Sequence, residues 1–146
     1  MRRWTVEDGP ALSRSIERNA EHLRPWMPWI AHEPLDPASR IRLIETWDVE
    51  WRSGGDVVLG VFMGGEIVGG GGLHRRIGPN GLEIGYWVDR DRTRQGVATE
   101  IARLLTTSAL GVPGITCAEV APVAPHQRPA VSRCRAAVRT GSRNPE

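Results

Sequence analysis

The chain has 146 residues, which is the size of one domain. A hydrophobic fraction of 40% and a charged fraction of 25% exclude a disordered or fibrous protein. No apolar run approaches the roughly 20 residues that a membrane span requires, and no apolar core follows the N-terminal arginines. Two cysteines build no disulfide framework, so we expect a cytoplasmic protein without a membrane partner.

The formal net charge is only +2, but it is unevenly distributed. All 19 basic residues are arginines, and residues 118–146 contain five of them beside two glutamates. Such a tail could bind a polyanion. It lacks the aromatic side chains on which bases stack, so we do not expect a nucleic acid as partner. Steep, salt-dependent binding to any duplex would contradict that expectation.

Apolar spacing and turn residues predict the elements of the first half of the chain. Residues 2–7 read as a strand, and Asp, Gly and Pro at positions 8–10 begin a helix over 11–23. Four prolines make residues 25–37 a structured loop. A second helix is expected over 38–52. The expected apolar stripes of the two helices are Leu12, Ile16, Ala20 and Leu23, and then Ile41, Ile44 and Trp47 or Trp51.

Strands dominate the second half. We expect them at residues 57–63, 66–76, 82–88 and 114–120. One helix over 96–110 follows a polar loop over 89–95. Four consecutive glycines, residues 69–72, indicate a bend or a close backbone approach. The fold class is therefore α/β, with a mixed, mostly antiparallel sheet flanked by helices.

The domain boundary is expected near residue 120. Residues 121–146 are rich in Arg, Ala and Pro, so we expect an irregular tail with a helical turn near 131–138.

The strand, loop and helix over 82–109 form the strongest candidate site. The first amides of a helix have no internal acceptor and lie at the positive end of its dipole, so they bind anions. Gly96 allows a ligand to approach the backbone, and Arg92 and Arg94 add positive charge. A pyrophosphate would suit this place. An ordinary helix start with solvated arginines remains the alternative.

The residues of this stretch resemble a known family. Residues 83–88 (Glu-Ile-Gly-Tyr-Trp-Val) and 95–100 (Gln-Gly-Val-Ala-Thr-Glu) resemble the acetyl-CoA signature of the GNAT superfamily of N-acetyltransferases. Thr93 departs from that signature, which has Gln or Arg at its position. Residues 23–29 (Leu-Arg-Pro-Trp-Met-Pro-Trp) and 69–75 (Gly-Gly-Gly-Gly-Leu-His-Arg) resemble the bacterial subgroup that acetylates the N-termini of ribosomal proteins.

The resemblance implies an acyl-CoA N-acyltransferase-like fold over residues 1–120 and acetyl-CoA as acyl donor, with no metal. The strand 82–88 would splay from its neighbour, and pantetheine would bond to the backbone there. Loop amides would hold the pyrophosphate. The residues implied in donor binding are Val88, Arg94, Gln95, Gly96, Val97, Ala98 and Thr99.

The acceptor would be a primary amine, such as the N-terminus of a ribosomal or other protein, approaching Trp26, Trp29 and His74. These tryptophans could equally pack on the core, and His74 could be structural. Glu83 is the candidate general base, through a water. Its alternative role is an ion pair with a neighbouring arginine. No covalent nucleophile is apparent, so direct attack in a ternary complex is expected.

The C-terminal part departs from the family pattern. Ser132 falls at the position of a Ser near the leaving thiolate, and is the second candidate catalytic residue. Pro129 replaces the expected Asn. We therefore hypothesise a truncated or frame-shifted ending, which would leave the sheet edge exposed for a homodimer. The alternative function is a catalytically impaired acyl-CoA-binding remnant, or a protein completed by a partner.

Overall fold

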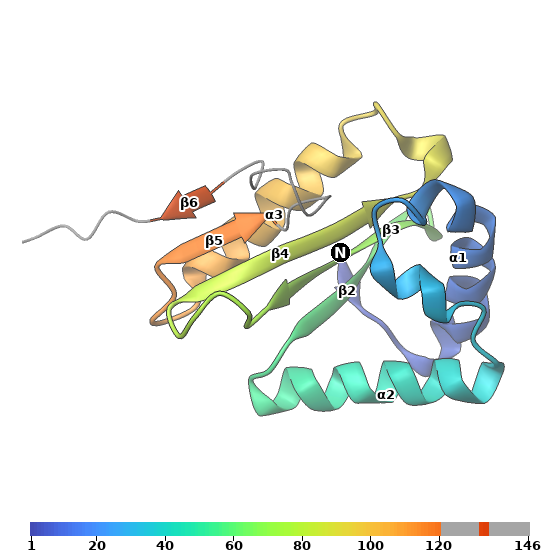
Figure 1. Ribbon diagram of the computed structural model, residues 1–146, viewed down its shortest axis with the longest axis horizontal. Helices are drawn as coiled ribbons and strands as arrows, with labels where there is room; N and C mark the ends of the chain where they lie inside the picture. Colours follow the sequence, from blue (N-terminus) through green and yellow to red (C-terminus); the bar gives the residue numbers. More distant parts are fainter. Residues whose placement is uncertain (121–131, 135–146) are drawn as a thin grey trace, which may run out of the picture.

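The computed structural model describes residues 1–120 and the backbone of residues 132–134. A six-stranded sheet in the order β1-β2-β3-β4-β5-β6 separates two layers of helices (Figure 1). The strands are β1 (Arg2–Arg3), β2 (Val57–Met63), β3 (Glu66–His74), β4 (Gly81–Val88), β5 (Cys117–Val120) and β6 (Ser132–Cys134). The helices are α1 (Gly9–Leu23), α2 (Pro37–Ser53) and α3 (Val97–Gly111), with 3-10 turns η1 (Val6–Asp8), η2 (Pro28–His32) and η3 (Arg90–Arg92).

All neighbouring strands are antiparallel except β4 and β5, which run parallel. A parallel pair needs a crossover, and α3 supplies it. The predicted α/β class and the mostly antiparallel sheet are confirmed. No helix in the described residues is long and apolar enough to cross a membrane.

Sequence signals determine the ends of the helices. Proline stands in the first turn of both α1 and α2, where its missing N–H costs nothing. The Asp36 side chain caps α2 by accepting a hydrogen bond from the Ser39 N–H at 2.9 Å. Gly54 ends α2 in the left-handed conformation, with φ at 76°.

Each face of the sheet has its own core. One face of β3 and β4 packs against α3 through Ile84, Ile101 and Leu105. The opposite face packs against α1, α2 and the η2 segment, and this second core includes Trp4, Leu12, Ile16, Ile44 and Ile67. Strand β4 therefore separates the two layers, with alternate side chains in each, as its sequence predicts.

The glycine run of β3 pairs with β4 without a break. Each of its four residues pairs in register with β4, opposite positions 85–88. A Cβ at Gly69 would lie 2.4 Å from the backbone oxygen of Trp87, and one at Gly71 would lie 2.9 Å from Leu105 Cδ1. Of the two predicted alternatives, the close approach is confirmed, because neighbours on both faces occupy the space of the missing side chains.

Three other predictions need correction. The expected strand over 2–7 pairs only at Arg2–Arg3 and then turns into η1. The proline-rich loop contains η2. At residues 132–134, within the stretch expected to contain a helical turn, the backbone instead forms strand β6, which pairs with β5. The edge of β5 is thus covered, which removes the reason given for a homodimer. The rest of the tail lies outside the described residues.

A buried ion pair attaches the η2 segment to the helices. Arg40, only 2% exposed, donates from Nη2 to Glu33 Oε2 at 2.6 Å and from Nε to Ser13 Oγ at 3.1 Å. The same Glu33 oxygen accepts from the Leu35 N–H at 3.0 Å. The Arg40 side chain therefore joins α2 to α1 through Ser13 and to the segment between the helices through Glu33.

Candidate functional site

The loop between β4 and α3 presents a concentrated set of backbone donors. We call residues 89–99, which are this loop and the first three residues of α3, the donor loop. Gly96, at φ 80°, caps α3, and its carbonyl accepts from the Glu100 N–H at 3.0 Å. The next three amides, of Val97, Ala98 and Thr99, precede any intrahelical acceptor and lie at the positive end of the α3 dipole.

The donor loop also has unusual backbone geometry. Among the described residues, Arg94 is the one residue other than glycine that has a positive φ, and this angle is 60°. Left-handed backbone at a residue with a Cβ is costly and is concentrated at functional sites. Gln95 Nε2 donates to the Asp91 carbonyl at 2.9 Å and braces the turn. No hydrogen bond or ion pair within the described residues engages the exposed Arg94 guanidinium, so its charge is available to an anion.

A buried network determines where this loop begins. Asp89, fully buried, accepts hydrogen bonds from Asn19 Nδ2 at 3.0 Å and from the Asp91 N–H at 2.9 Å, and forms an ion pair with Arg18. Asn19 Oδ1 in turn accepts from the Arg90 N–H at 2.8 Å. Sequence reasoning missed these contacts, which connect α1 to the donor loop, because no local pattern indicates them.

Asp89 is charged in this network. Burial by itself raises the pKa of its carboxyl, but the hydrogen bonds from Asn19 and Arg18 outweigh burial and hold the pKa below its usual value. An ionised carboxylate only accepts hydrogen bonds, which matches the three donors around it.

Strand β4 extends past the described part of its parallel neighbour. Its pairing with β5 runs from Gly81 to Ile84, which lies opposite Val120. Over residues 85–88 the edge of β4 that faces away from β3 has no partner strand among residues 1–120 and 132–134. Val88, which ends this segment, leads directly into the donor loop. The backbone where the sequence predicts pantetheine is therefore continuous with the donor loop.

Four ionisable side chains gather at the other end of β4. We call Asp56, His74, Arg76 and Glu83 the histidine cluster. His74 of β3 lies directly opposite Glu83 of β4 in the antiparallel register. Glu83 Oε1 accepts from Arg76 Nη1 at 3.2 Å, and His74 Nδ1 lies 2.7 Å from Asp56 Oδ2. The ion pair that was the alternative role of Glu83 is thus present.

Asp56 is ionised and orients His74. Burial raises the pKa of Asp56, but hydrogen bonds from the Arg75 N–H at 3.0 Å and from His74, with the charge of Arg76, lower it below its usual value. Because an ionised carboxylate only accepts, Nδ1 of His74 carries a proton, and in the neutral imidazole the lone pair is then on Nε2. Sequence reasoning identified His74 and Glu83 but missed Asp56.

The fold places the remaining predicted site residues in different parts of the molecule. Trp29 packs partly buried against the second core, together with Trp87 of β4, whereas Trp26 is 46% exposed. Ser132 lies in β6, and its backbone pairs with Glu119 of β5. Pro129 lies outside the described residues. The structure thus brings Glu83 and His74 together and places the donor loop at the far end of β4.

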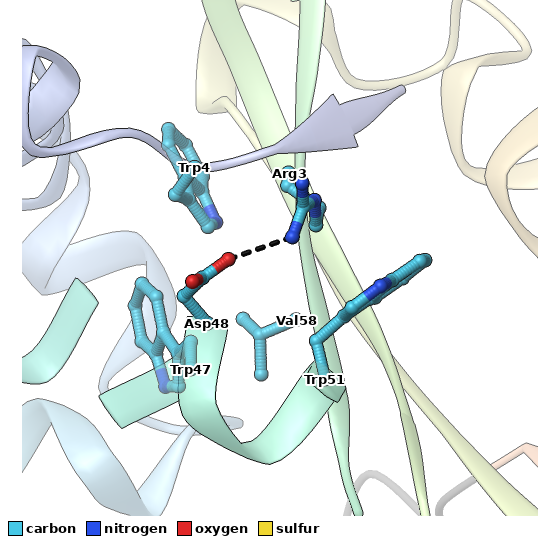
Figure 2. A pocket seen from close by; sticks show the side chains of 6 residues that line it. All are labelled: Arg3, Trp4, Trp47, Asp48, Trp51 and Val58. Carbon is cyan, nitrogen blue, oxygen red and sulfur yellow. Dashed lines mark hydrogen bonds and ion pairs between the residues drawn. The ribbon is translucent and has the colours of Figure 1, made fainter. Parts of the chain in front are cut away.

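Two cavities lie elsewhere, between the N-terminal segment and α2. Figure 2 shows the smaller one, of about 10 Å³, where Arg3 bonds to Asp48 at 2.6 Å among three tryptophans. That volume is at most one water molecule. The larger, of about 390 Å³, is lined by residues 3–7 and by one side of α2. Neither includes a predicted site residue, because the candidate site is an open sheet edge and a surface loop.

The described residues do not gather the ligands of a metal site. Over residues 1–120 and 132–134, no group of three His, Cys, Asp or Glu side chains could hold an ion. The expectation that the cysteines form no disulfide framework is wrong for Cys117, which is half-buried and disulfide-bonded.

A comparison with protein families identifies the class of protein to which this fold and loop belong. The model of the acetyltransferase (GNAT) domain matches residues 1–134. The chain belongs to this family. None of the curated proteins compared with the chain matches it.

Solved structures with the same fold include acetyltransferases in complex with coenzyme A. The ribosomal L7/L12 α-N-protein acetyltransferase RimL in complex with coenzyme A is 19% identical, with a TM-score of 0.72 over 82% of this chain and 67% of that chain. RimJ of Mycobacterium smegmatis in complex with CoA-disulfide is 24% identical, with a TM-score of 0.69 over 84% and 61%.

A third neighbour acts in self-immunity. The Microcin C7 self immunity acetyltransferase MccE, in complex with acetyl-CoA and AMP, is 16% identical, with a TM-score of 0.70 over 80% and 64%. The present chain thus spans about two thirds of the length of these proteins.

Proposed function

We propose that this protein transfers an acetyl group from acetyl-CoA to a primary amine, by direct attack in a ternary complex. The observation that carries the proposal is the donor loop, where the exposed Arg94 and left-handed Gly96 directly precede three helix-terminal amides. A pyrophosphate carries two negative charges and many acceptor oxygens, which such a surface satisfies. The edge of β4 that has no partner strand among the described residues leads from this loop toward the histidine cluster.

The acceptor amine would approach from the α1 and α2 side of the sheet. Glu83, Gly85 and Trp87 face that side of β4, and His74 faces it from β3. RimL, which shares this fold, is an α-N-protein acetyltransferase of ribosomal L7/L12. A protein N-terminus, such as that of a ribosomal protein, is therefore the acceptor we propose, in the cytoplasm where ribosomal proteins are made.

The first test is acetyl-CoA binding by calorimetry to wild type and to Gly96→Asp. A carboxylate about 4 Å from a phosphate costs roughly 4 kcal/mol at the effective dielectric of a protein surface, so we expect affinity to fall at least about 100-fold. Gly96→Asn is the matched control, because asparagine has the same shape, tolerates positive φ and lacks the charge. No binding by wild type, or equal binding by Gly96→Asp, would contradict the donor site.

Glu83 is proposed to take the ammonium proton of the acceptor through a water. Its carboxylate is 20% exposed and so remains accessible to water. We expect Glu83→Gln to lower kcat by about 100-fold or more at neutral pH, since general-base catalysis contributes about that much. Acetyl-CoA affinity should stay unchanged, because the donor loop lies at the other end of β4. Unchanged turnover would remove Glu83 from the mechanism.

The alternative is an acyl-CoA-binding remnant or a protein that a partner must complete. It predicts tight acetyl-CoA binding without turnover on any amine, and the same two measurements distinguish it from the enzyme. Ser132 keeps its proposed role beside the leaving thiolate, and Ser132→Ala should then slow turnover without weakening acetyl-CoA binding.

A further inference from the structure

We infer that Asp56 is a positioning residue that fixes His74 as the carrier of the proton leaving the site, a role that rests on the proposed acetyl transfer. The two oxygens of Asp56 have different partners. Oδ1 accepts from the Arg75 N–H at 3.0 Å, and Oδ2 accepts from His74 Nδ1 at 2.7 Å. The backbone bond holds the carboxylate in place, and the carboxylate holds the ring.

The ring lies where two glycines make room for it. A Cβ at Gly72 would lie 2.9 Å from His74 Nε2, and one at Gly85 would lie 3.5 Å away. Gly72 and Gly85 are opposite each other in the ladder, and Gly85 is the first β4 residue beyond the described pairing with β5. Nε2 is therefore located over the start of the unpaired β4 edge. No hydrogen bond to Nε2 is formed within the described residues.

Glu83 must release the proton that it takes from the acceptor before it can act again. Protonation would break the charge pairing with Arg76 at 3.2 Å and leave that cation facing a neutral group. His74 is the neighbour directly across the ladder that can accept the proton at Nε2. The resulting imidazolium is stabilised by the Asp56 carboxylate at Nδ1 and by the negative charge restored on Glu83.

In the acetyl-transfer step the attacking nitrogen loses two protons, one to water and one to the CoA thiolate. The acceptor ammonium loses one proton, which passes through Glu83 to His74 Nε2 and then to water. The amine nitrogen forms a bond to the acetyl carbonyl carbon, and the carbon–sulfur bond of the thioester breaks. The second proton of the attacking nitrogen passes to the CoA thiolate, giving an amide and free CoA.

The activity-independent test is the tautomer of His74 in Asp56→Asn, read from imidazole ¹⁵N shifts by NMR at alkaline pH. In this variant the Arg75 N–H requires the one remaining side-chain oxygen at position 56 as its acceptor, so the new NH₂ group would face Nδ1. We expect His74 to carry its proton on Nδ1 in wild type and on Nε2 in Asp56→Asn. An unchanged tautomer would overturn the positioning role.

Kinetics with peptides that begin with serine or alanine test the relay itself. His74→Gln and Asp56→Asn should each lower kcat by about 100-fold, with the KM for acetyl-CoA within about 3-fold of wild type. His74→Gln combined with Glu83→Gln should be no slower than the slower single variant, because members of one relay are non-additive. Fully multiplicative effects, or wild-type turnover of His74→Gln, would overturn the relay.

Two controls separate this inference from the proposed function. His22→Gln replaces a half-buried histidine of α1 outside the site and should keep kcat within about 2-fold of wild type. If wild type fails to bind acetyl-CoA in the calorimeter, the proposed function fails, whatever the tautomer. If it binds and the tautomer does not change, the inference about Asp56 fails alone.

Discussion

Gly69→Ala is expected to lower the free energy of unfolding by about 3 kcal/mol or more, among the largest effects of a single methyl group in this protein. The new Cβ would lie 2.4 Å from the Trp87 carbonyl oxygen and 3.4 Å from the Val88 Cα. Both obstacles are backbone atoms of the paired strand, so no rotamer change relieves the clash. Either β3 separates locally from β4 or the ladder shifts.

Urea unfolding measures this cost as a change in the transition midpoint at constant slope. Gly111→Ala is the matched control, because a Cβ at Gly111 meets nothing within 4 Å. We expect the control to stay within about 0.5 kcal/mol of wild type. A Gly69→Ala protein as stable as the control would show that β3 and β4 approach less closely than described. Since Trp87 and Val88 precede the donor loop, the loss should also weaken acetyl-CoA binding.

Glu33→Gln is expected to cost about 3–5 kcal/mol of stability, because it leaves the buried Arg40 guanidinium without a countercharge. Arg40 is 2% exposed and Glu33 only 8%, so water cannot replace the lost carboxylate. The remaining hydrogen bond from Arg40 to Ser13 Oγ does not neutralise the charge. Breaking one side of such a pair is costly even where the intact pair adds little.

A second variant separates the loss of charge from the loss of shape. Glu33→Gln combined with Arg40→Met removes both charges, and we expect it to recover most of the stability that Glu33→Gln loses. Glu17→Gln, at an exposed position of α1, should change stability by no more than about 0.5 kcal/mol. A single variant as stable as wild type would contradict the buried pair, and a double variant as unstable as the single one would assign the cost to shape.

Local pattern was enough to predict most elements of the fold. The alternation in β4 correctly assigned Ile84 and Trp87 to opposite faces, because strand periodicity needs no knowledge of the partner. In α2 the expected stripe fails at Ile41 and Trp51, which are exposed, while Arg40 is buried. An arginine becomes a core residue only when a distant carboxylate meets it, and no local signal reveals that.

In the candidate site, too, the local features could be predicted and the contacts between distant residues were missed. The donor loop could be predicted because helix N-termini and glycine positions are local features, and the family signature covers them. The sequence indicated Glu83 and His74 as separate candidates. The alternative role was an ion pair for Glu83 and a structural role for His74. Asp56 was missed because its role depends on an 18-residue separation that strand pairing closes. Asn19 and Asp89 were missed for the same reason, at a separation of 70 residues.

The bridge between Asn19 and Asp89 also determines which parts of the molecule open together. The Arg90 amide bonds to Asn19 of α1, and the Asp91 amide bonds to Asp89, which Asn19 and Arg18 hold in place. Local unfolding of α1 would therefore expose these loop amides to solvent, even though α3 and the sheet remain intact. The helix on the acceptor side and the loop on the donor side thus form one cooperative unit across the edge of the sheet. Whatever orders α1, an incoming acceptor included, would also steady the donor loop.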